Sequence, residues 1–302
     1  MTDDTLTVML ADLARTETIE GWPDALPPHL SASSLGTMRC LEMWRKVYLV
    51  GEREAPGGAL LWGRADQTAA TVNYEQKIAS HVDLPVSDVE DAFASALDEA
   101  IDECGGAGEV NWKDSSPADT LDRGVALAAA YHVQAAPRVQ PVATEERFEL
   151  QVPGVPVPVI GFMDVIAGYQ IDVLPDVFPE RVIERKTAAK MSRKITPGWR
   201  LQTMIYQAAK GLPVDIHLSV KTKTPAVYTP LEEPGLADPR DPAVDARVAA
   251  IVKSRASLLI ACVETYGVEG PWPDAVSSGE FSDLCHFCGF GPVNANTCAW
   301  WR

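Results

Sequence analysis

The sequence predicts a mixed α/β protein in which helices flank a sheet of parallel and antiparallel strands. Apolar residues recur with helical spacing in the first third of the chain, and from about Glu145 they alternate in steps of two. A further helical segment, ended by Gly211, separates the last two strand-like segments. The order of helices, three strands, a helix and a strand favours a mixed sheet over an alternating doubly wound fold.

Three helices are expected before the strands. Residues 30–50 read as one helix with a serine at its start, and a second helix is expected from about Trp62 to Ile78. Ser87 and Glu90 have the spacing of a capping box at the start of a third helix. An apolar stripe supports this third helix, formed by Val89, Phe93, Leu97 and Ile101. Residues 104–120 then read as a loop within an insertion.

Alternating segments predict four strands, at residues 145–152, 157–170, 181–187 and 214–223. Helices are expected at 200–212, between the last two strands, and at 236–266. The domain organisation expected is a leader at residues 1–27 and a single domain at 28–302, with a helical insertion at about 80–135.

Composition limits the class of protein. The chain has 302 residues, of which 46% are apolar, enough for one sizeable core. Its start carries acidic residues where a secretory signal has basic ones, and no segment reaches membrane-spanning length. We therefore expect a cytoplasmic protein without a membrane partner, in which clustered cysteines indicate metal binding rather than disulfides.

Charge is distributed unevenly along the chain. The formal net charge of −16 disfavours a general nucleic-acid coat, because affinity for phosphates depends on basic residues. Residues 181–223, however, hold ten basic residues against two acidic ones. This segment predicts a confined site for a polyanion on an acidic body, although a chance cluster of solvated charges fits equally well.

The segment VIERKT, residues 182–187, places Glu184 and Lys186 on one face of a strand and Arg185 on the other. Alone, this pattern also fits a weak surface ion pair. One strand earlier lies Asp164, in the segment GFMDV. If the two strands are neighbours, the two carboxylates converge, and oxygen donors on rigid strands are what magnesium accepts. A lysine beside them can help to orient or deprotonate a metal-bound water and stabilise developing negative charge.

Asp164, the Glu184-x-Lys186 pair, and Gln202 and Tyr206 in QTMIY together resemble the PD-(D/E)XK nuclease superfamily, specifically its RecB-type exonuclease branch. The resemblance implies a restriction-endonuclease-like fold and a hydrolase that cuts DNA with magnesium or manganese. By analogy with the family, we expect an exonuclease that acts at single-stranded ends. In that scheme Asp164 and Glu184 hold the metal and Lys186 assists the attacking water. Gln202 and Tyr206, four residues apart on one helix face, position the DNA strand. Phosphates are expected to contact Arg185, Lys190, Arg193, Lys194 and Arg200.

One position departs from the RecB-type pattern. The family has a metal-binding histidine four residues after a glycine on an early helix, and here Gly63 is followed by Gln67. An amide oxygen of Gln67 can ligate a hard cation more weakly, and Asp66 or Glu75 can substitute. The resemblance therefore predicts a metal site that is weakened, differently built or inactive.

Four cysteines suggest a second metal centre. Cys285 and Cys288 form a CxxC pair, Cys298 follows within the 285–298 segment, and Cys40 lies far upstream. RecB-type nucleases with an iron–sulfur cluster, including CRISPR-adaptation exonucleases, AddB repair subunits and phage-encoded exonucleases, use this layout. The resemblance implies a 4Fe-4S cluster that joins the N- and C-terminal segments. A four-cysteine zinc site remains an alternative from the spacing alone.

Two other functions remain open. The chain can be a catalytically weakened DNA-binding or adaptor protein of the same fold, or a zinc-stabilised interaction module whose acidic body meets a basic partner. Protein partners in recombination, repair or CRISPR adaptation are further expectations from the resemblance.

Overall fold

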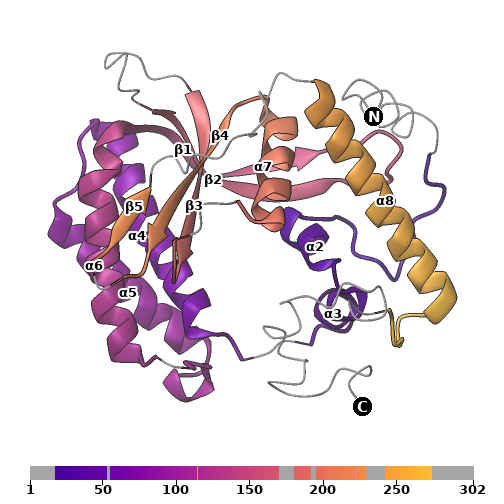
Figure 1. Ribbon diagram of the computed structural model, residues 1–302, viewed down its shortest axis with the longest axis horizontal. Coiled ribbons are helices and arrows are strands. Elements are labelled where there is room, and N and C mark those ends of the chain that lie inside the picture. Colours follow the sequence, from indigo (N-terminus) through magenta and orange to yellow (C-terminus); the bar gives the residue numbers. More distant parts are fainter. Residues whose placement is uncertain are drawn as a thin grey trace.

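The computed structural model describes residues 18–52, 55–113, 115–169, 180–191, 195–222, 224–228 and 242–273. A five-stranded sheet lies between two groups of helices, which confirms the mixed α/β prediction (Figure 1). One group comprises α4 (Gly58–Ser80), α5 (Val86–Glu103) and α6 (Pro117–Gln134). The other comprises α2 (Ala32–Thr37), α3 (Leu41–Arg45), α7 (Pro197–Lys210) and α8 (Pro242–Tyr266). Single turns of other helix types lie at Lys46–Val50, Ala107–Glu109 and Ala136–Arg138.

The strands follow one another across the sheet in chain order: β1 (Val139–Leu150), β2 (Val159–Tyr169), β3 (Glu180–Ala188), β4 (Val214–Val220) and β5 (Ala226–Tyr228). Only the β3–β4 pair among them is parallel, and α7 is the crossover that parallel neighbours require. The first four strands were predicted within a few residues, except that β1 starts six residues earlier. The short strand β5 was not predicted.

Two predictions about the helices are wrong, although a serine, Ser31, does cap the start of α2 as expected. Residues 30–50 form α2, α3 and a π-helical turn rather than one helix, and Cys40 caps α3, its sulfur accepting a hydrogen bond from the Met43 amide at 3.5 Å. The third helix starts at Val86, directly after Pro85, so Ser87 lies inside it and donates to the Asp88 carboxylate. The N-terminal helix signal at Ser116, which caps α6, was missed because it follows a loop-like sequence.

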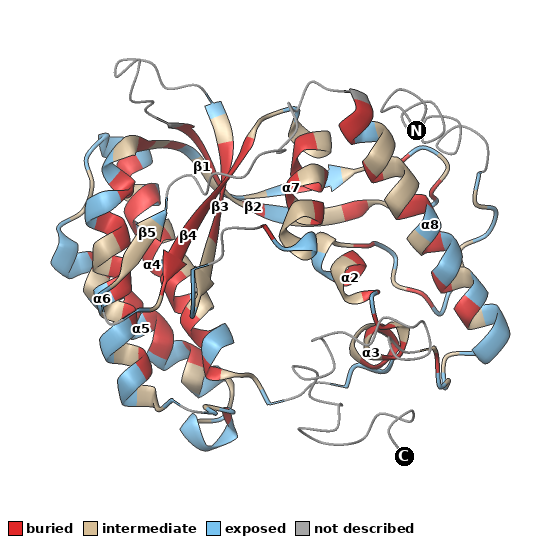
Figure 2. Ribbon diagram, in the orientation of Figure 1, coloured by how far each residue is buried: buried red, intermediate tan, exposed pale blue. Residues whose placement is uncertain are grey.

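Each face of the sheet has its own apolar core (Figure 2). One core packs α7 and α8 with α2 and α3, and the other packs α4 and α6. All seven residues of β4 are buried, as expected for a strand that is covered on both faces. No helix within the described ranges has both the length and the apolar run needed to cross a lipid bilayer.

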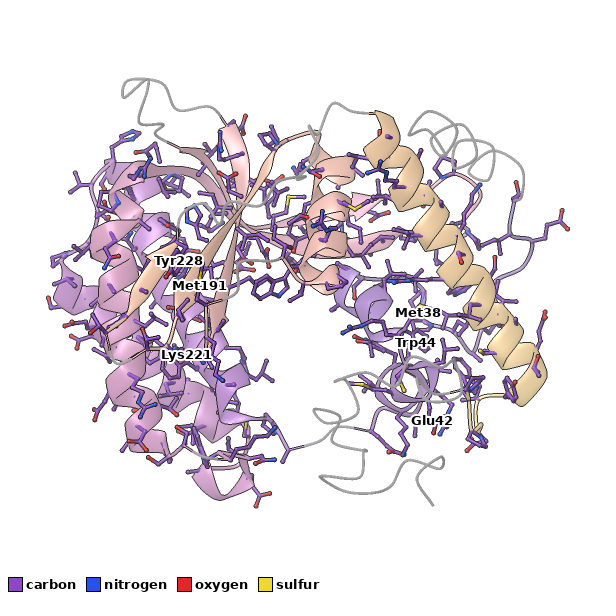
Figure 3. All side chains as sticks on the ribbon, in the orientation of Figure 1. Met38, Glu42, Trp44, Met191, Lys221 and Tyr228 are labelled. Atoms are coloured by element: carbon purple, nitrogen blue, oxygen red, sulfur yellow. The ribbon has the colours of Figure 1, made fainter. Side chains whose placement is uncertain are left out.

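The last described residues dock on α3 (Figure 3). The Trp272 ring stacks on Trp44, with centroids 5.8 Å apart and planes 8° from parallel. The Trp272 amide donates to Glu42 Oε2 at 2.8 Å, and the Glu42 amide donates to the Pro273 carbonyl at 3.1 Å. The chain beyond α8 is therefore anchored one turn from Cys40.

Candidate functional site

Asp164 on β2 and Glu184 on β3 lie side by side in the sheet. The antiparallel ladder pairs Val165 with Ile183, and the next position in the same register brings the two acids opposite each other. The backbone amide of Arg185 donates to Asp164 Oδ2 at 2.8 Å, which fixes this carboxylate against β3. Both acids line a hollow of about 500 Å³, as do Gln67 of α4 and Lys186. The predicted convergence of the two carboxylates is present.

The electrostatics of this pair suit a bound cation. Burial raises the pKa of Asp164 well above its usual value, and the nearby Glu184 carboxylate raises it further. Burial also raises the pKa of Glu184, against the opposing effect of Lys186. Glu184 is only 2% exposed, and its Oε2 has no hydrogen-bond partner. Burial of a carboxylate oxygen without a partner is energetically unfavourable unless the oxygen binds a proton or a cation.

The donor set is oxygen-rich, from two carboxylates and the Gln67 amide, and therefore fits a hard divalent cation such as magnesium or manganese. Among the described residues, no three histidine, cysteine, aspartate or glutamate side chains form a metal-holding group.

A hydrogen-bond network connects Lys186 and Glu184 to α7. Lys186 Nζ donates to Glu184 Oε1 and, at 2.9 Å, to Gln202 Oε1. Gln202 Nε2 donates to Glu184 Oε1 at 2.8 Å and to the Tyr206 hydroxyl at 2.7 Å. The Tyr206 hydroxyl in turn donates to the Phe162 carbonyl at 2.8 Å. Gln202 and Tyr206 thus hold Glu184 and Lys186 in place, and their predicted contact with DNA stays a prediction.

Gln67 faces the hollow from α4 and is tied to a residue that the sequence did not single out. Its amide Nε2 donates to Glu145 Oε1 at 2.8 Å. Glu145 lies between the β1 residues that pair with Met163 and Val165, which places it opposite Asp164. Its φ of +49° is left-handed, an unfavourable conformation for glutamate and one that clusters at functional sites. The sequence offered one indication of Glu145: it is a carboxylate in the strand expected next to β2, where it can lie opposite Asp164. Of the two substitutes considered for Gln67, Glu75 is exposed on α4. Asp66 lines the hollow and pairs with Arg185 through Oδ2, which leaves its buried Oδ1 without a hydrogen-bond partner.

Arg185 is buried rather than available to phosphates, which corrects its predicted role. Its guanidinium donates to the Asp66 carbonyl at 2.7 Å and to Asp66 Oδ2 at 2.8 Å. The same group lies over the Tyr131 ring, 4.1 Å from the centroid. The Tyr131 hydroxyl bonds to His217 Nδ1 at 2.8 Å, and burial together with nearby arginines lowers the pKa of His217 to about 3. Arg185 therefore belongs to the polar interior that joins β3 to α4 and α6.

Some basic residues of the segment 181–223 form ion pairs with acidic residues of the protein itself. Arg181 pairs with Asp215 at 2.5 Å, and Lys210 pairs with Glu146. Among the predicted phosphate contacts, Lys190 is exposed and Arg200 is partly exposed. Arg193 and Lys194 lie outside the described residues.

The cysteine prediction can be followed only at its upstream end. Cys40 is buried at the start of α3, beside the docked segment that ends at Pro273. Cys285, Cys288 and Cys298 lie outside the described residues. Cys285 follows Pro273 by twelve residues, and an extended chain of that length spans up to about 40 Å. The chain is therefore long enough for Cys285 to come next to Cys40.

No family model and no curated protein matches the chain.

Proposed function

We propose that this protein is a metal-dependent DNA exonuclease of the RecB-type PD-(D/E)XK class. The observation that carries the proposal is the meeting of Asp164, Glu184 and Lys186 in one hollow, with a buried Glu184 oxygen that lacks a partner. A surface ion pair, the alternative reading of VIERKT, does not account for a glutamate that is 2% exposed.

The residues take the following roles. Asp164 and Glu184 hold the cation, and Gln67 adds a weaker oxygen from α4. A magnesium or manganese ion bound there would supply a water of lowered pKa and would neutralise negative charge that builds on the phosphate. Lys186 orients the attacking water and stabilises negative charge on the phosphate, while Gln202 fixes the Lys186 ammonium at 2.9 Å. We assign Lys190, which is exposed, and Arg200, which is partly exposed, to contacts with flanking phosphates.

The test is digestion of end-labelled single- and double-stranded DNA by the full-length protein with Mg²⁺, with Mn²⁺ and with EDTA. We expect stepwise shortening from an end with either metal and none with EDTA. Linear and circular substrates distinguish exonuclease from endonuclease action. Intact DNA under all metal conditions contradicts the proposal.

An adaptor function is the second candidate, because Gln67 stands where the family has a histidine, and its amide oxygen is a weaker ligand for a hard cation. A gel-shift measurement on the same oligonucleotides separates the two functions. Metal-independent DNA binding without shortening supports the adaptor.

We also propose that Cys40 holds an iron–sulfur cluster together with Cys285, Cys288 and Cys298. The support is the placement of Cys40 beside the anchored end of the described chain, where Trp272 stacks on Trp44. A cluster at this place closes nearly the whole chain into a loop, so its binding contributes to folding.

Anaerobic purification tests the cluster. We expect a brown protein containing iron and sulfide, and a Cys40→Ala variant that loses both the colour and most of the iron. Cys104→Ala is the matched control, because Cys104 lies in a turn after α5 and should keep the full iron content. A colourless protein that contains zinc overturns the assignment.

A further inference from the structure

A second hollow adjoins the first. It measures about 560 Å³, and Lys186 lines both. Its other walls come from the start of α2, from β1 and β2, and from the α7 residues Gln202 and Tyr206. A phosphate held at Asp164 and Glu184 would therefore have a neighbouring nucleotide at the mouth of this second hollow.

Phe162, in the β2 wall of the second hollow, is unusually exposed for a phenylalanine. It lies two residues before Asp164 on β2 and is 53% exposed, although large aromatic side chains are usually buried. Its backbone is fixed, because its carbonyl accepts the Tyr206 hydroxyl hydrogen bond at 2.8 Å and its strand position pairs with Arg147. A rigidly mounted, half-exposed ring beside a candidate phosphate site is suited to stacking.

The rest of the lining matches a nucleobase. Phe148 and Ile160 provide apolar surface. Ser31 Oγ caps α2 and hydrogen-bonds to Ser33 Oγ at 3.0 Å, and the remaining capacity of the Ser33 hydroxyl can serve the edge of a base. Gly36 leaves room on the α2 side, since a Cβ atom added there meets no heavy atom within 4 Å. A flat heterocycle has both an apolar face and a polar edge, and aromatic side chains stack on any of the four bases.

Resting on the nuclease function proposed above, we propose that the second hollow receives the base next to the scissile phosphate and that Phe162 is its stacking platform. Both faces of a base inside a duplex are covered by its neighbours, so the base that stacks on Phe162 comes from an unpaired strand or from the end of a strand.

The test is a two-by-two binding cycle. A parent protein with Phe162 intact and its Phe162→Ala variant are each titrated with a single-stranded oligonucleotide and with the same oligonucleotide carrying one abasic position, scanned over the terminal nucleotides. Both proteins carry Glu184→Gln so that the DNA stays intact. Fluorescence anisotropy gives the dissociation constants, and quenching of 2-aminopurine at the scanned position reports stacking.

We expect Phe162→Ala to weaken binding of the complete oligonucleotide by about 5- to 150-fold, the range that corresponds to one base–aromatic stack. Its effect on the oligonucleotide that is abasic at the stacked position should be less than twofold, and Phe162→Trp should restore binding and quenching. Val142→Ala is the matched control, because Val142 is an exposed β1 side chain outside the lining of either hollow. Equal losses on both oligonucleotides, no loss on either, or no binding by the parent protein overturn the inference.

A second variant tests the hollow without touching the ring. Gly36→Leu should fill the space and weaken binding of the complete oligonucleotide while sparing the abasic one. Gly108→Leu is its control, since Gly108 also has no heavy atom within 4 Å of an added Cβ and lies outside the hollow. Unaltered binding by Gly36→Leu contradicts the placement of the base.

The binding cycle and the digestion experiment can refute the stacking inference and the nuclease proposal independently of each other. Phe162-dependent binding of a base by a protein that never cleaves DNA keeps the stacking inference and removes the nuclease proposal. Metal-dependent cleavage with binding that ignores Phe162 does the reverse.

Discussion

Replacement of Glu184 by glutamine is expected to reduce the rate of metal-dependent DNA cleavage by about 10³-fold or more, since a metal ion contributes several kcal/mol of transition-state stabilisation. Glutamine keeps the size of the side chain and can still bond with Lys186 and Gln202, but it removes the negative charge that faces the cation. The measurement is the single-turnover rate at saturating Mn²⁺.

Glu149→Gln is the matched control for this prediction. Glu149 is an exposed glutamate on β1 that pairs with Arg147 at 3.1 Å, so loss of its charge should leave the rate within about twofold, as expected for a surface ion pair. A Glu184→Gln protein that keeps more than a tenth of the wild-type rate contradicts the assignment of Glu184 as a metal ligand.

Thermal stability gives a readout of the same substitution that does not require activity. Without a cation the two carboxylates repel each other, which is one cause of the raised pKa of Asp164. Manganese should therefore raise the melting temperature of the wild-type protein, because a ligand that binds only the folded state stabilises it. Glu184→Gln should lose most of that metal-induced shift without being destabilised in EDTA.

Much of this arrangement could be predicted from the sequence because it depends on local spacing. Alternation in β2 and β3 located Asp164 and Glu184, and two-residue spacing correctly separated Arg185 from Glu184 and Lys186. Which side of β3 is solvent was not predictable, because the helices that cover Arg185 come from more than fifty residues upstream.

Other features were missed because tertiary contacts decide them. Glu145 became part of the site only when β1 paired with β2 and its backbone adopted a left-handed conformation, which the sequence does not signal for glutamate. The expected helix across residues 30–50 is interrupted at Met38–Cys40, where Cys40 changes from a helix-interior residue to a cap. Pro85 determined the start of α5 more strongly than the capping-box pattern at Ser87.

Replacement of Arg185 by methionine is expected to lower the free energy of unfolding by about 3–5 kcal/mol, because removal of one partner from a buried ion pair leaves an uncompensated charge. Asp66 is 2% exposed and its Oδ1 has no hydrogen-bond partner, and its carboxylate forms an ion pair with the Arg185 guanidinium at 2.8 Å. Loss of the contact between the guanidinium and the Tyr131 ring adds to the effect. Urea unfolding followed by circular dichroism measures the change.

Arg64→Met is a control on the same helix as Asp66. Arg64 pairs with Glu103 at 2.7 Å, but both side chains are more than half exposed, so this substitution should cost less than about 1 kcal/mol. Similar losses for Arg64→Met and Arg185→Met would show that burial does not determine the strength of these pairs.

A double variant separates loss of the buried pair from general misfolding. Asp66→Leu combined with Arg185→Met removes both charges, and it should recover a large part of the stability that Arg185→Met loses, because the cost of a broken buried pair is the unpaired charge. Recovery of stability in the double variant does not require that its affinity for the metal also recovers. The Arg185 backbone amide fixes Asp164, and the Asp66 side chain fixes the segment of α4 that carries Gln67, so the pair links the folding of β3 and α4 to the geometry of the carboxylates. A double variant that is stable but binds manganese more weakly than the wild type would show that this buried pair positions the metal site as well as stabilising the fold.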